Sequence, residues 1–314
     1  MLVYTLKRLA AGAITVFFIA TATFTAMHLV PGDPLTSDKA LTPEIRANLE
    51  AKYGLDRPVL VQYGVFLRSM ATGDFGISFT QQNRSVNDII REHFPVSAIL
   101  GVLSLFFSTL GGILFGSLSA RSRGRMADRT ILFLVVLGIS VPSFVFAALG
   151  QQFVLELNRL LGATVLPVAG WGTLRHMLLP ALALGLGTLA FLTRLMRSSL
   201  LEVVHQDYIR TARAKGLPPW RILIAHQLRN GILPVITLLG PALAAITTGG
   251  FVVESVFAIP GLGRYFVQAV QQLDYTVIMG LTVFYGSFLV FMVIVVDIVY
   301  GLVDPRIRVA REAV

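Results

Sequence analysis

The sequence contains no cysteine and few charged residues. Without cysteine it can form no disulfide framework, no thiolate metal site and no thiol nucleophile. Charged residues make up 14% of the chain, against roughly 25% in a soluble domain. Apolar residues make up 55%, and the mean hydropathy is +0.74. We therefore expect an all-α membrane protein rather than two soluble domains.

Recognisable catalytic and metal-binding motifs are also absent. The sequence has no His-Glu-x-x-His, no Gly-x-Ser-x-Gly and no phosphate-binding Gly-x-x-x-x-Gly-Lys-[Ser/Thr]. Glu254 and Asp297 lie near the ends of apolar segments, where pairing with an arginine or with backbone groups is favoured over a catalytic role. The histidines lack ligand spacing; they are His28, His93, His176, His205 and His226. The chain is thus predicted not to be an enzyme and to hold no metal or cofactor of its own.

Six apolar stretches are long enough to cross about 30 Å of hydrocarbon as helices. They lie near residues 9–30, 96–120, 130–155, 177–196, 232–253 and 277–300. The first begins like a signal peptide, but its apolar run continues to Pro31, which favours a retained helix. The fourth is the weakest, because Arg194 and Arg197 fall in or just after its last turn.

Lysine and arginine are concentrated on one side of these spans. They cluster in residues 7–8, 121–129, 197–229 and 306–311, whereas the opposite short loops hold only Arg159, Arg175 and Arg264. The positive-inside rule then places both termini in the cytoplasm and the long loop of residues 31–95 outside. The net charge of +9 thus indicates orientation in a membrane rather than binding of nucleic acid.

The predicted organisation has three parts. Residues 1–30 form the first span, residues 31–95 an extracytoplasmic subdomain, and residues 96–314 a core with five further spans and a cytoplasmic loop at about 197–231. In the external loop, one helix is expected from Thr42-Pro43-Glu44 to Gly54 and another from Pro58 to Gly73. This loop is either a folded cap over the helices or a docking surface for an extracytoplasmic partner.

The cytoplasmic loop contains a short polar helix with abrupt ends. Val204, Tyr208 and Ala212 are four residues apart and so are expected on one face, and Asp207 can pair with Arg210. Gly216 can end the helix, and Pro218-Pro219 forbids its continuation. A lipid-surface helix, a structural loop and a helix held in the cleft of a partner protein are the alternatives. Ala212 would permit close approach and the basic residues would line the rim, which favours the partner.

The same stretch carries a family resemblance. Asp207-Tyr208-Ile209-Arg210-Thr211-Ala212-Arg213-Ala214-Lys215-Gly216-Leu217, followed by His226-Gln227-Leu228-Arg229-Asn230 and Leu233-Pro234, resembles the EAA coupling loop of bacterial ABC-importer permeases. The chain is similar to the dipeptide/oligopeptide/nickel permease family, in its first-permease (B-type) branch. Further matching motifs are Pro31-Gly32-Asp33-Pro34, Tyr53-Gly54-Leu55-Asp56-Arg57-Pro58 with Gln62-Tyr63, Gly73-Asp74-Phe75-Gly76-Ile77-Ser78, Glu254-Ser255-Val256-Phe257-Ala258-Ile259-Pro260-Gly261-Leu262-Gly263-Arg264 and Asp304-Pro305-Arg306.

The loop departs from the general EAA pattern in ways that are usual in the peptide branch. Arg210 stands where the glutamate would be, and Thr211 replaces the first alanine. His226 replaces an isoleucine, and the Leu233-Pro234 pair comes five positions late. A role known for the glutamate in other branches therefore does not transfer to this chain.

The resemblance implies a type I ABC-importer permease fold in the bacterial inner membrane. It also implies four kinds of partner: the lipid bilayer, a second homologous permease (as a heterodimer), two ABC ATPase subunits that hold ATP and Mg, and an extracytoplasmic substrate-binding protein. The ATPases would move the permease between inward-facing and outward-facing states. The residues expected to couple to the ATPase are Asp207, Tyr208, Arg210, Thr211, Ala212, Arg213, Lys215 and Gly216.

The cargo is less well defined than the family. Di- and oligopeptides are the expected substrates, with nickel or a nickel chelate as the main alternative and glutathione, opines or sugar oligomers as further members of the range. A secondary transporter would require polar groups at the midplane of broken helices, which these apolar spans do not offer. A membrane enzyme would require a site that the sequence lacks.

Overall fold

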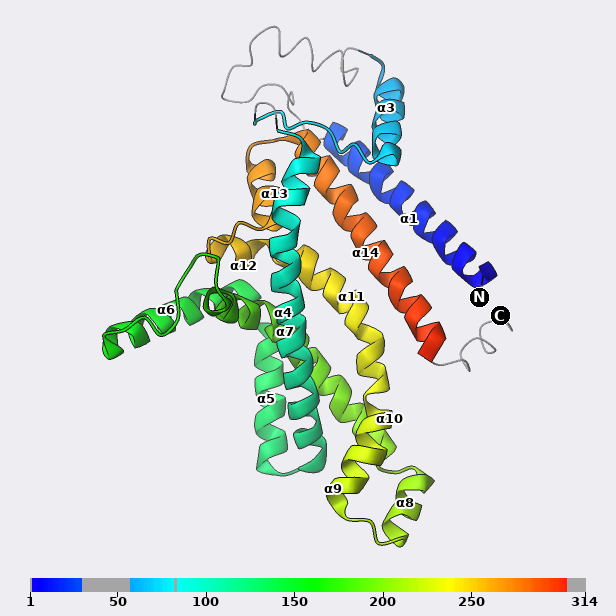
Figure 1. The fold of residues 1–314 in the computed structure, drawn as a ribbon, viewed down its shortest axis with the longest axis vertical. Coiled ribbons are helices and arrows are strands. Elements are labelled where there is room, and N and C mark those ends of the chain that lie inside the picture. Colours follow the sequence, from blue (N-terminus) through cyan, green and yellow to red (C-terminus); the bar gives the residue numbers. More distant parts are fainter. Residues whose placement is uncertain (1, 30–56, 82–83, 304–314) are drawn as a thin grey trace. The chain divides into compact units, whose positions relative to one another are not determined.

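The computed structural model describes residues 2–29, 57–81 and 84–303, and these residues are mostly helical (Figure 1). The helices are α1 (Leu2–Leu29), α3 (Val59–Thr72), α4 (Val86–Arg121), α5 (Met126–Ser140), α6 (Ser143–Leu161), α7 (Leu174–Val203), α8 (Asp207–Ala214), α9 (Pro219–Arg221), the π-helix η1 (Ile222–Leu228), α10 (Arg229–Gly231), α11 (Leu233–Gly249), α12 (Phe251–Val256), α13 (Leu262–Gln271) and α14 (Tyr275–Val303).

The chain folds into two compact units. Unit 1 combines the residues up to Ser97 with those from Pro260 onward, and unit 2 is Ala98–Ile259. Helix α4 begins in unit 1 and continues into unit 2. This division follows packing within the chain, whereas the boundaries predicted at residues 30 and 95 are boundaries of membrane topology.

Four described helices are each long and apolar enough to cross a membrane: α1, α4, α7 and α14. Two bent pairs satisfy the same criteria together, α5 with α6, bent by 108°, and residues 219–231 with 233–248, bent by 48°. The structure thus has four candidate spans, or six if each bent pair counts as one. Each of the six predicted stretches falls on one of these helices or bent pairs.

The predicted continuous helix over residues 130–155 is wrong. Helix α5 ends at Ser140 and α6 begins at Ser143, with Val141 in an extended conformation (φ −92°, ψ 126°). Pro142 causes the break, because the proline ring disfavours the helical conformation of the preceding residue and cannot donate a backbone hydrogen bond. The hydropathy of the stretch predicted one continuous span and did not indicate this break.

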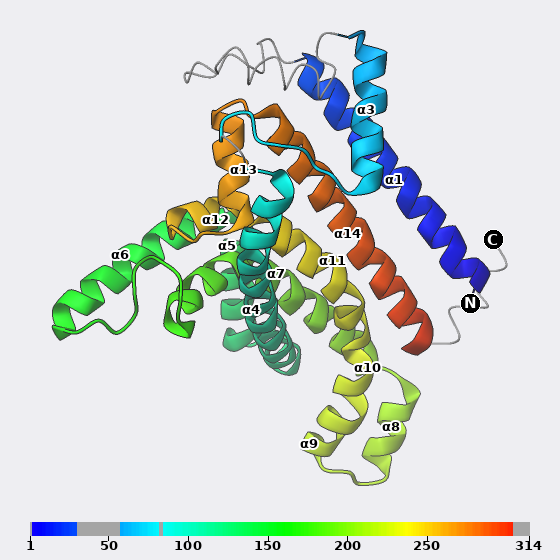
Figure 2. The ribbon, with the colours of Figure 1, turned by 45° about the horizontal axis from the view of Figure 1, so that its top comes forward.

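In unit 1, α1 and α14 pack side by side (Figure 2). Each helix brings a glycine to the contact: a Cβ on Gly12 would lie 2.9 Å from Ile294 Cδ1, and one on Gly286 would lie 2.8 Å from Ile19 Cδ1. Small residues allow helices to approach closely where packing, rather than water exclusion, drives association. The first and last candidate spans are therefore neighbours.

Helix α3 confirms the helix predicted from Pro58 to Gly73. Gly73 adopts a left-handed conformation (φ 75°), and its N–H and that of Asp74 bond to the carbonyls of Met70 and Ser69, which completes the helix end. The helix lies against α1, where Tyr63 forms a hydrogen bond of 2.6 Å with Thr21 and its ring lies tilted against Phe24, with the ring centroids 5.2 Å apart. The helix predicted from Thr42 to Gly54 lies outside the described residues.

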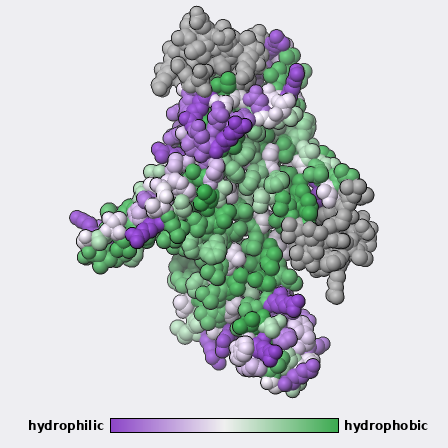
Figure 3. All heavy atoms as spheres, viewed as in Figure 1, coloured by the Kyte–Doolittle hydropathy of each residue, from purple (hydrophilic) through white to green (hydrophobic). Residues whose placement is uncertain are grey.

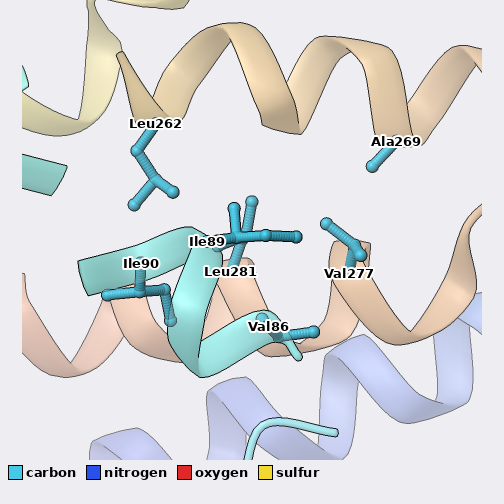
Figure 4. Close-up of a cluster of buried hydrophobic side chains, with 7 residues drawn as sticks. All are labelled: Val86, Ile89, Ile90, Leu262, Ala269, Val277 and Leu281. Atoms are coloured by element: carbon cyan, nitrogen blue, oxygen red, sulfur yellow. The ribbon is translucent and has the colours of Figure 1, made fainter. Parts of the chain in front are cut away.

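The core of unit 1 gathers where α4, α13 and α14 meet (Figure 4). Side chains from the three helices point toward one another there; they are Val86, Ile89, Ile90, Leu262, Ala269, Val277 and Leu281. Helix α13 itself was not predicted, because residues 260–264 were noted only as part of a matching family motif. Gly261 is extended (φ −89°, ψ 167°) and α13 begins at Leu262.

One buried carboxylate fixes residues 78–80 of unit 1. Asp274 is 1% exposed and accepts hydrogen bonds from the Ser78 and Thr80 hydroxyls and from the backbone N–H groups of Phe79 and Thr80. A fifth bond comes from the N–H of Val277 at the start of α14. We call Asp274 with residues 78–80 the Asp274 clip.

In unit 2, α4 packs closely on α7. A Cβ on Gly112 would lie 2.6 Å from Leu192 Cβ, and one on Gly116 would lie 2.7 Å from the Thr193 carbonyl oxygen. The pair of small residues at these positions therefore does permit close helix approach, as its spacing suggests. Ser108 on α4 also donates a hydrogen bond of 2.7 Å to the carbonyl of Gly185 on α7.

Candidate functional site

Helix α8 occupies the position predicted for the short cytoplasmic helix. It runs from Asp207 to Ala214, and Gly216 then adopts φ +72°, a conformation that glycine reaches without steric cost. The N–H of Gly216 bonds to Arg213 O and that of Leu217 to Ala212 O, so the glycine reverses the chain at the helix end. Pro218 follows in an extended conformation, and Pro219 begins α9.

The inner face of α8 packs on its own chain. Ile209 is fully buried and Ala212 is 5% exposed, and both pack against Ile222 of η1, with Val203 and Leu217 at the edge. The buried face thus consists of residues three apart, Ile209 and Ala212. The predicted shared face of Val204, Tyr208 and Ala212 is wrong, because Val204 precedes α8 and Tyr208 is 40% exposed.

This packing changes the role of Ala212. The sequence suggested that its small side chain lets a partner approach closely. In the structure Ala212 instead allows α8 to lie close to Ile222, so its small size serves the loop's own fold.

The outer face of α8 is polar. Asp207, Arg210, Thr211 and Lys215 are exposed, and Asp207 and Arg210 form the predicted pair at 3.4 Å. Arg210 and Asp207 side chains are 72% and 95% exposed, so the pair is open to water and contributes little to stability. Figure 3 shows hydrophilic residues gathered at the end of unit 2 that carries α8 and α9, next to the hydrophobic surface of α4 and α5.

A hydrogen bond links α8 to the helix that follows η1. The Asn230 amide donates to the Tyr208 hydroxyl at 3.0 Å. Asn230 lies on α10, so the helical segment between α8 and α11 is tied to α8 at two places, Tyr208 and the Ile209–Ala212 face. Of the predicted coupling residues, Tyr208 and Ala212 therefore contact the chain itself, and the others are exposed or form the cap.

An ion pair near this loop was not predicted. Arg197 of α7 donates two hydrogen bonds of 2.9 Å to Asp128 in the first turn of α5. Ser119 and the N–H of Gly124 also donate to Asp128, which is 3% exposed. The sequence placed Arg197 at the end of the fourth apolar stretch and gave it no partner. The sequence did contain one indication of an ion pair, since Asp128 is the only acidic residue in a segment that holds Arg121, Arg123, Arg125 and Arg129.

The two acidic residues near the ends of apolar segments lie on different helices. Glu254 is 1% exposed within α12, and Asp297 falls in α14. Within residues 2–29, 57–81 and 84–303, no three His, Asp or Glu side chains come together as a possible metal site. His93 stacks on Tyr265, and its Nδ1 lies 2.9 Å from the carbonyl oxygen of Pro260.

Two family models together match nearly the whole chain. Residues 112–309 match "Binding-protein-dependent transport system inner membrane component", and residues 1–101 match the N-terminal part of the same type of membrane component.

Curated relatives also match along almost the full length. A dipeptide transport system permease protein, DppB, of Bacillus subtilis is 45% identical over 310 residues, which cover 98% of this chain and 99% of the relative. Oligopeptide transport system permease proteins, OppB, of Haemophilus influenzae and Escherichia coli are 42% and 40% identical, over 98% of this chain and 100% of each relative.

The fold resembles a chain in a structure described as inward facing conformations of the MetNI methionine ABC transporter. The TM-score is 0.52 at 18% sequence identity, and the match covers 68% of this chain and 94% of the other.

Proposed function

The chain belongs to the family of binding-protein-dependent transport system inner membrane components, and on that premise we propose that it is the B-type permease subunit of an importer for dipeptides or oligopeptides. The observation that carries the proposal is the 45% identity, over 98% of the chain, to a dipeptide permease. The names of the other relatives favour peptides over nickel.

The assembly follows from the family and from what the chain lacks. The sequence contains no phosphate-binding loop, so ATP and Mg would be held by ABC ATPase subunits. An extracytoplasmic binding protein would deliver the peptide, and a second, different permease would complete the pathway. Transport would proceed by alternating access, with ATP and the loaded binding protein each favouring one of two packings.

We assign the contact with the ATPase to the outer face of α8. This face is polar, exposed and carried on a helix whose other face is anchored to η1. A force applied to α8 would therefore be passed through Ile209 and Ala212 to η1 and on to α11. The residues proposed to touch the ATPase are Asp207, Arg210, Thr211 and Lys215; Tyr208, Ala212 and Gly216 hold α8 in position, and Arg213 lines a cavity behind the helix.

Charge reversal on the outer face tests this assignment. Arg210→Glu with Lys215→Glu should reduce peptide uptake and peptide-stimulated ATP hydrolysis at least about tenfold, because like charges set against a matched surface cost several kcal/mol. The measurement uses the complete importer in proteoliposomes. Arg123→Glu with Arg125→Glu makes the same change in charge in the turn before α5 and should retain transport. Equal loss in both pairs would contradict a specific role for α8.

The cargo is tested separately, with the unmodified importer. Labelled dipeptide and tetrapeptide should be taken up and should compete with each other, whereas Ni²⁺ should neither be transported nor compete. Uptake of nickel without peptide would overturn the peptide assignment while leaving the coupling role of α8 intact.

We also propose that both termini and α8 face the cytoplasm and α3 faces outward, since the basic residues lie on the α8 side. The absence of cysteine allows a direct test. In spheroplasts, a membrane-impermeant maleimide should label Ala71→Cys on α3 and should label Ala214→Cys on α8 only after lysis. The opposite pattern would reverse the orientation.

A further inference from the structure

A cavity of about 470 Å³ lies behind α8, entirely within unit 2. Its volume falls within the range of roughly 300–1,000 Å³ that is typical of small-molecule sites. The ends of α4 and α7, the residues after α8, and η1 form its walls. The lining residues are Ser117, Ala120, Arg121, Leu200, Val204, Arg213, Leu217, Pro219, Ile222, Leu223 and Gln227.

The charged lining of the cavity is exclusively positive. Arg121 ends α4 and Arg213 lies in the last turn of α8, and no aspartate or glutamate lines the cavity. Neither arginine forms an ion pair with another residue in the described part of the chain. The nearby carboxylate of Asp128 is already engaged by Arg197. Two exposed arginines thus line one cavity without an anion from this chain.

The cavity is also lined by uncharged polar side chains. The Ser117 hydroxyl is buried and has no hydrogen-bond partner in the described structure. Gln227 adds an amide to the lining. A buried hydroxyl without a partner costs about 1–3 kcal/mol, so a bound acceptor would remove a real penalty.

The rest of the lining is apolar. Leu200, Val204, Leu217, Ile222 and Leu223 contribute most of it. Helices α4 and α7 are both candidate membrane spans, and the cavity lies at the end of each, next to the loop that carries α8. A free inorganic anion would gain nothing from such walls, whereas an amphiphile with an anionic head would match both parts of the lining.

We propose that this cavity is a binding site for the phosphoryl headgroup of an anionic phospholipid. Arg121 and Arg213 bind the phosphate oxygens, and the apolar walls contact the glycerol backbone and the first acyl carbons. Basic pockets between membrane helices at the cytoplasmic surface bind phospholipid headgroups in this way. The lipid would rest between α8 and the ends of α4 and α7, so it would help to hold α8 in place. The site itself requires only the membrane location of the chain and not the coupling role of α8.

The test counts bound lipid on the purified full-length chain in a neutral detergent by native mass spectrometry. Phosphatidylglycerol should bind with a one-to-one component that phosphatidylcholine lacks. Arg121→Gln with Arg213→Gln should weaken this component about 30-fold, or about fivefold for each arginine. Gln227→Glu, which adds a negative charge without changing size, should also abolish it. Replacement of both arginines by lysine should preserve it.

The matched control is Arg123→Gln with Arg210→Gln. These arginines neighbour Arg121 in sequence and Arg213 on α8 but do not line the cavity, so binding should change less than about twofold. An equal loss in the control would mean a diffuse basic surface and would overturn the proposal.

Two further outcomes would overturn it in favour of other occupants. Inorganic phosphate that displaces phosphatidylglycerol at equal concentration would identify a free-anion site. Loss of the bound lipid on addition of the ATPase subunits would mean that an acidic side chain of the ATPase fills the cavity. Circular dichroism of each variant checks that the helices remain folded.

Discussion

Two polar clusters of this chain use their hydrogen-bonding groups in opposite ways. In the Asp274 clip, a carboxylate that is 1% exposed receives five hydrogen bonds from its own chain. On the outer face of α8, the side chains of Asp207 and Arg210 share one long contact of 3.4 Å and are otherwise open. The first cluster is complete within the chain and so is structural. The second has unused binding capacity, which is what a contact with another subunit requires.

Asp128 and Arg197 resemble the Asp274 clip, because their polar groups are paired within the chain. They lie in the same unit as α8, yet their groups are paired with each other, with Ser119 and with Gly124. Closeness in sequence to the basic loop therefore does not identify residues that bind a partner. The state of pairing distinguishes them better, and the predictions below test that distinction.

The largest effect is expected at the Asp128–Arg197 pair. Asp128→Ala leaves a guanidinium and the Ser119 hydroxyl without their acceptor, and should lower the free energy of unfolding by about 3–5 kcal/mol. The measurement is thermal or denaturant unfolding of the full chain in detergent. Asp128→Ala combined with Arg197→Met should recover part of the loss, because the second change removes the unpaired charge. An additive double mutant would mean that the two residues do not act as a pair.

A somewhat smaller effect is expected at the clip. Asp274→Ala removes the acceptor for the buried Ser78 hydroxyl and the Phe79 N–H, and should cost about 2–4 kcal/mol. Limited proteolysis should then cut within residues 77–81 at lower protease concentration than in the unmodified chain. Asp88→Ala, at an exposed acid in the first turn of α4, is the control and should leave cleavage unchanged.

The same substitution at two alanines of α8 compares its buried face with its exposed face. Ala212→Trp forces a large ring between α8 and Ile222 and should destabilise the loop by about 1–3 kcal/mol. Ala214→Trp places the same ring on an exposed position and should leave the loop folded. Protease sensitivity of residues 206–218 measures both. Equal sensitivity would mean that α8 does not pack as described.

The smallest effect is expected for Tyr208→Phe. It removes one half-exposed hydrogen bond to Asn230 and should cost about 0.5–1 kcal/mol. Asn230→Ala should cost a similar amount, and the double variant little more than either single one, because both remove the same bond. A thermal shift assay on the three variants measures this, and fully additive costs would exclude the bond.

Much of this architecture could be predicted from the sequence, because a helix that crosses the hydrocarbon of a membrane must consist of a long run of apolar residues. The apolar runs located every candidate span, and Pro58 with Gly73 fixed both ends of α3. Gly216 correctly marked the end of α8, since its φ of +72° is one that residues with a side chain seldom adopt.

The failures have local physical causes. The hydropathy of an apolar run does not show whether the helix is straight or bent. The bend between α5 and α6 depends on a single residue, Pro142, within an otherwise apolar stretch. The buried face of α8 was assigned by a spacing of four, whereas the contact with η1 selects Ile209 and Ala212, which are three apart. The partners of Arg197 and Asp274 lie 69 and up to 196 residues away, and pairings over such separations depend on packing that no local pattern encodes.

The inward position of Ala212 has a consequence for how this loop can change over generations. Ile209, Ala212 and Ile222 share one small volume, so a larger residue at one of them must be offset by a smaller residue at another within the same gene. Under the proposed coupling, changes at Asp207, Arg210 or Lys215 would instead be offset in the gene for the ATPase. The two faces of an eight-residue helix would thus carry two separate patterns of covariation, one inside this chain and one between subunits.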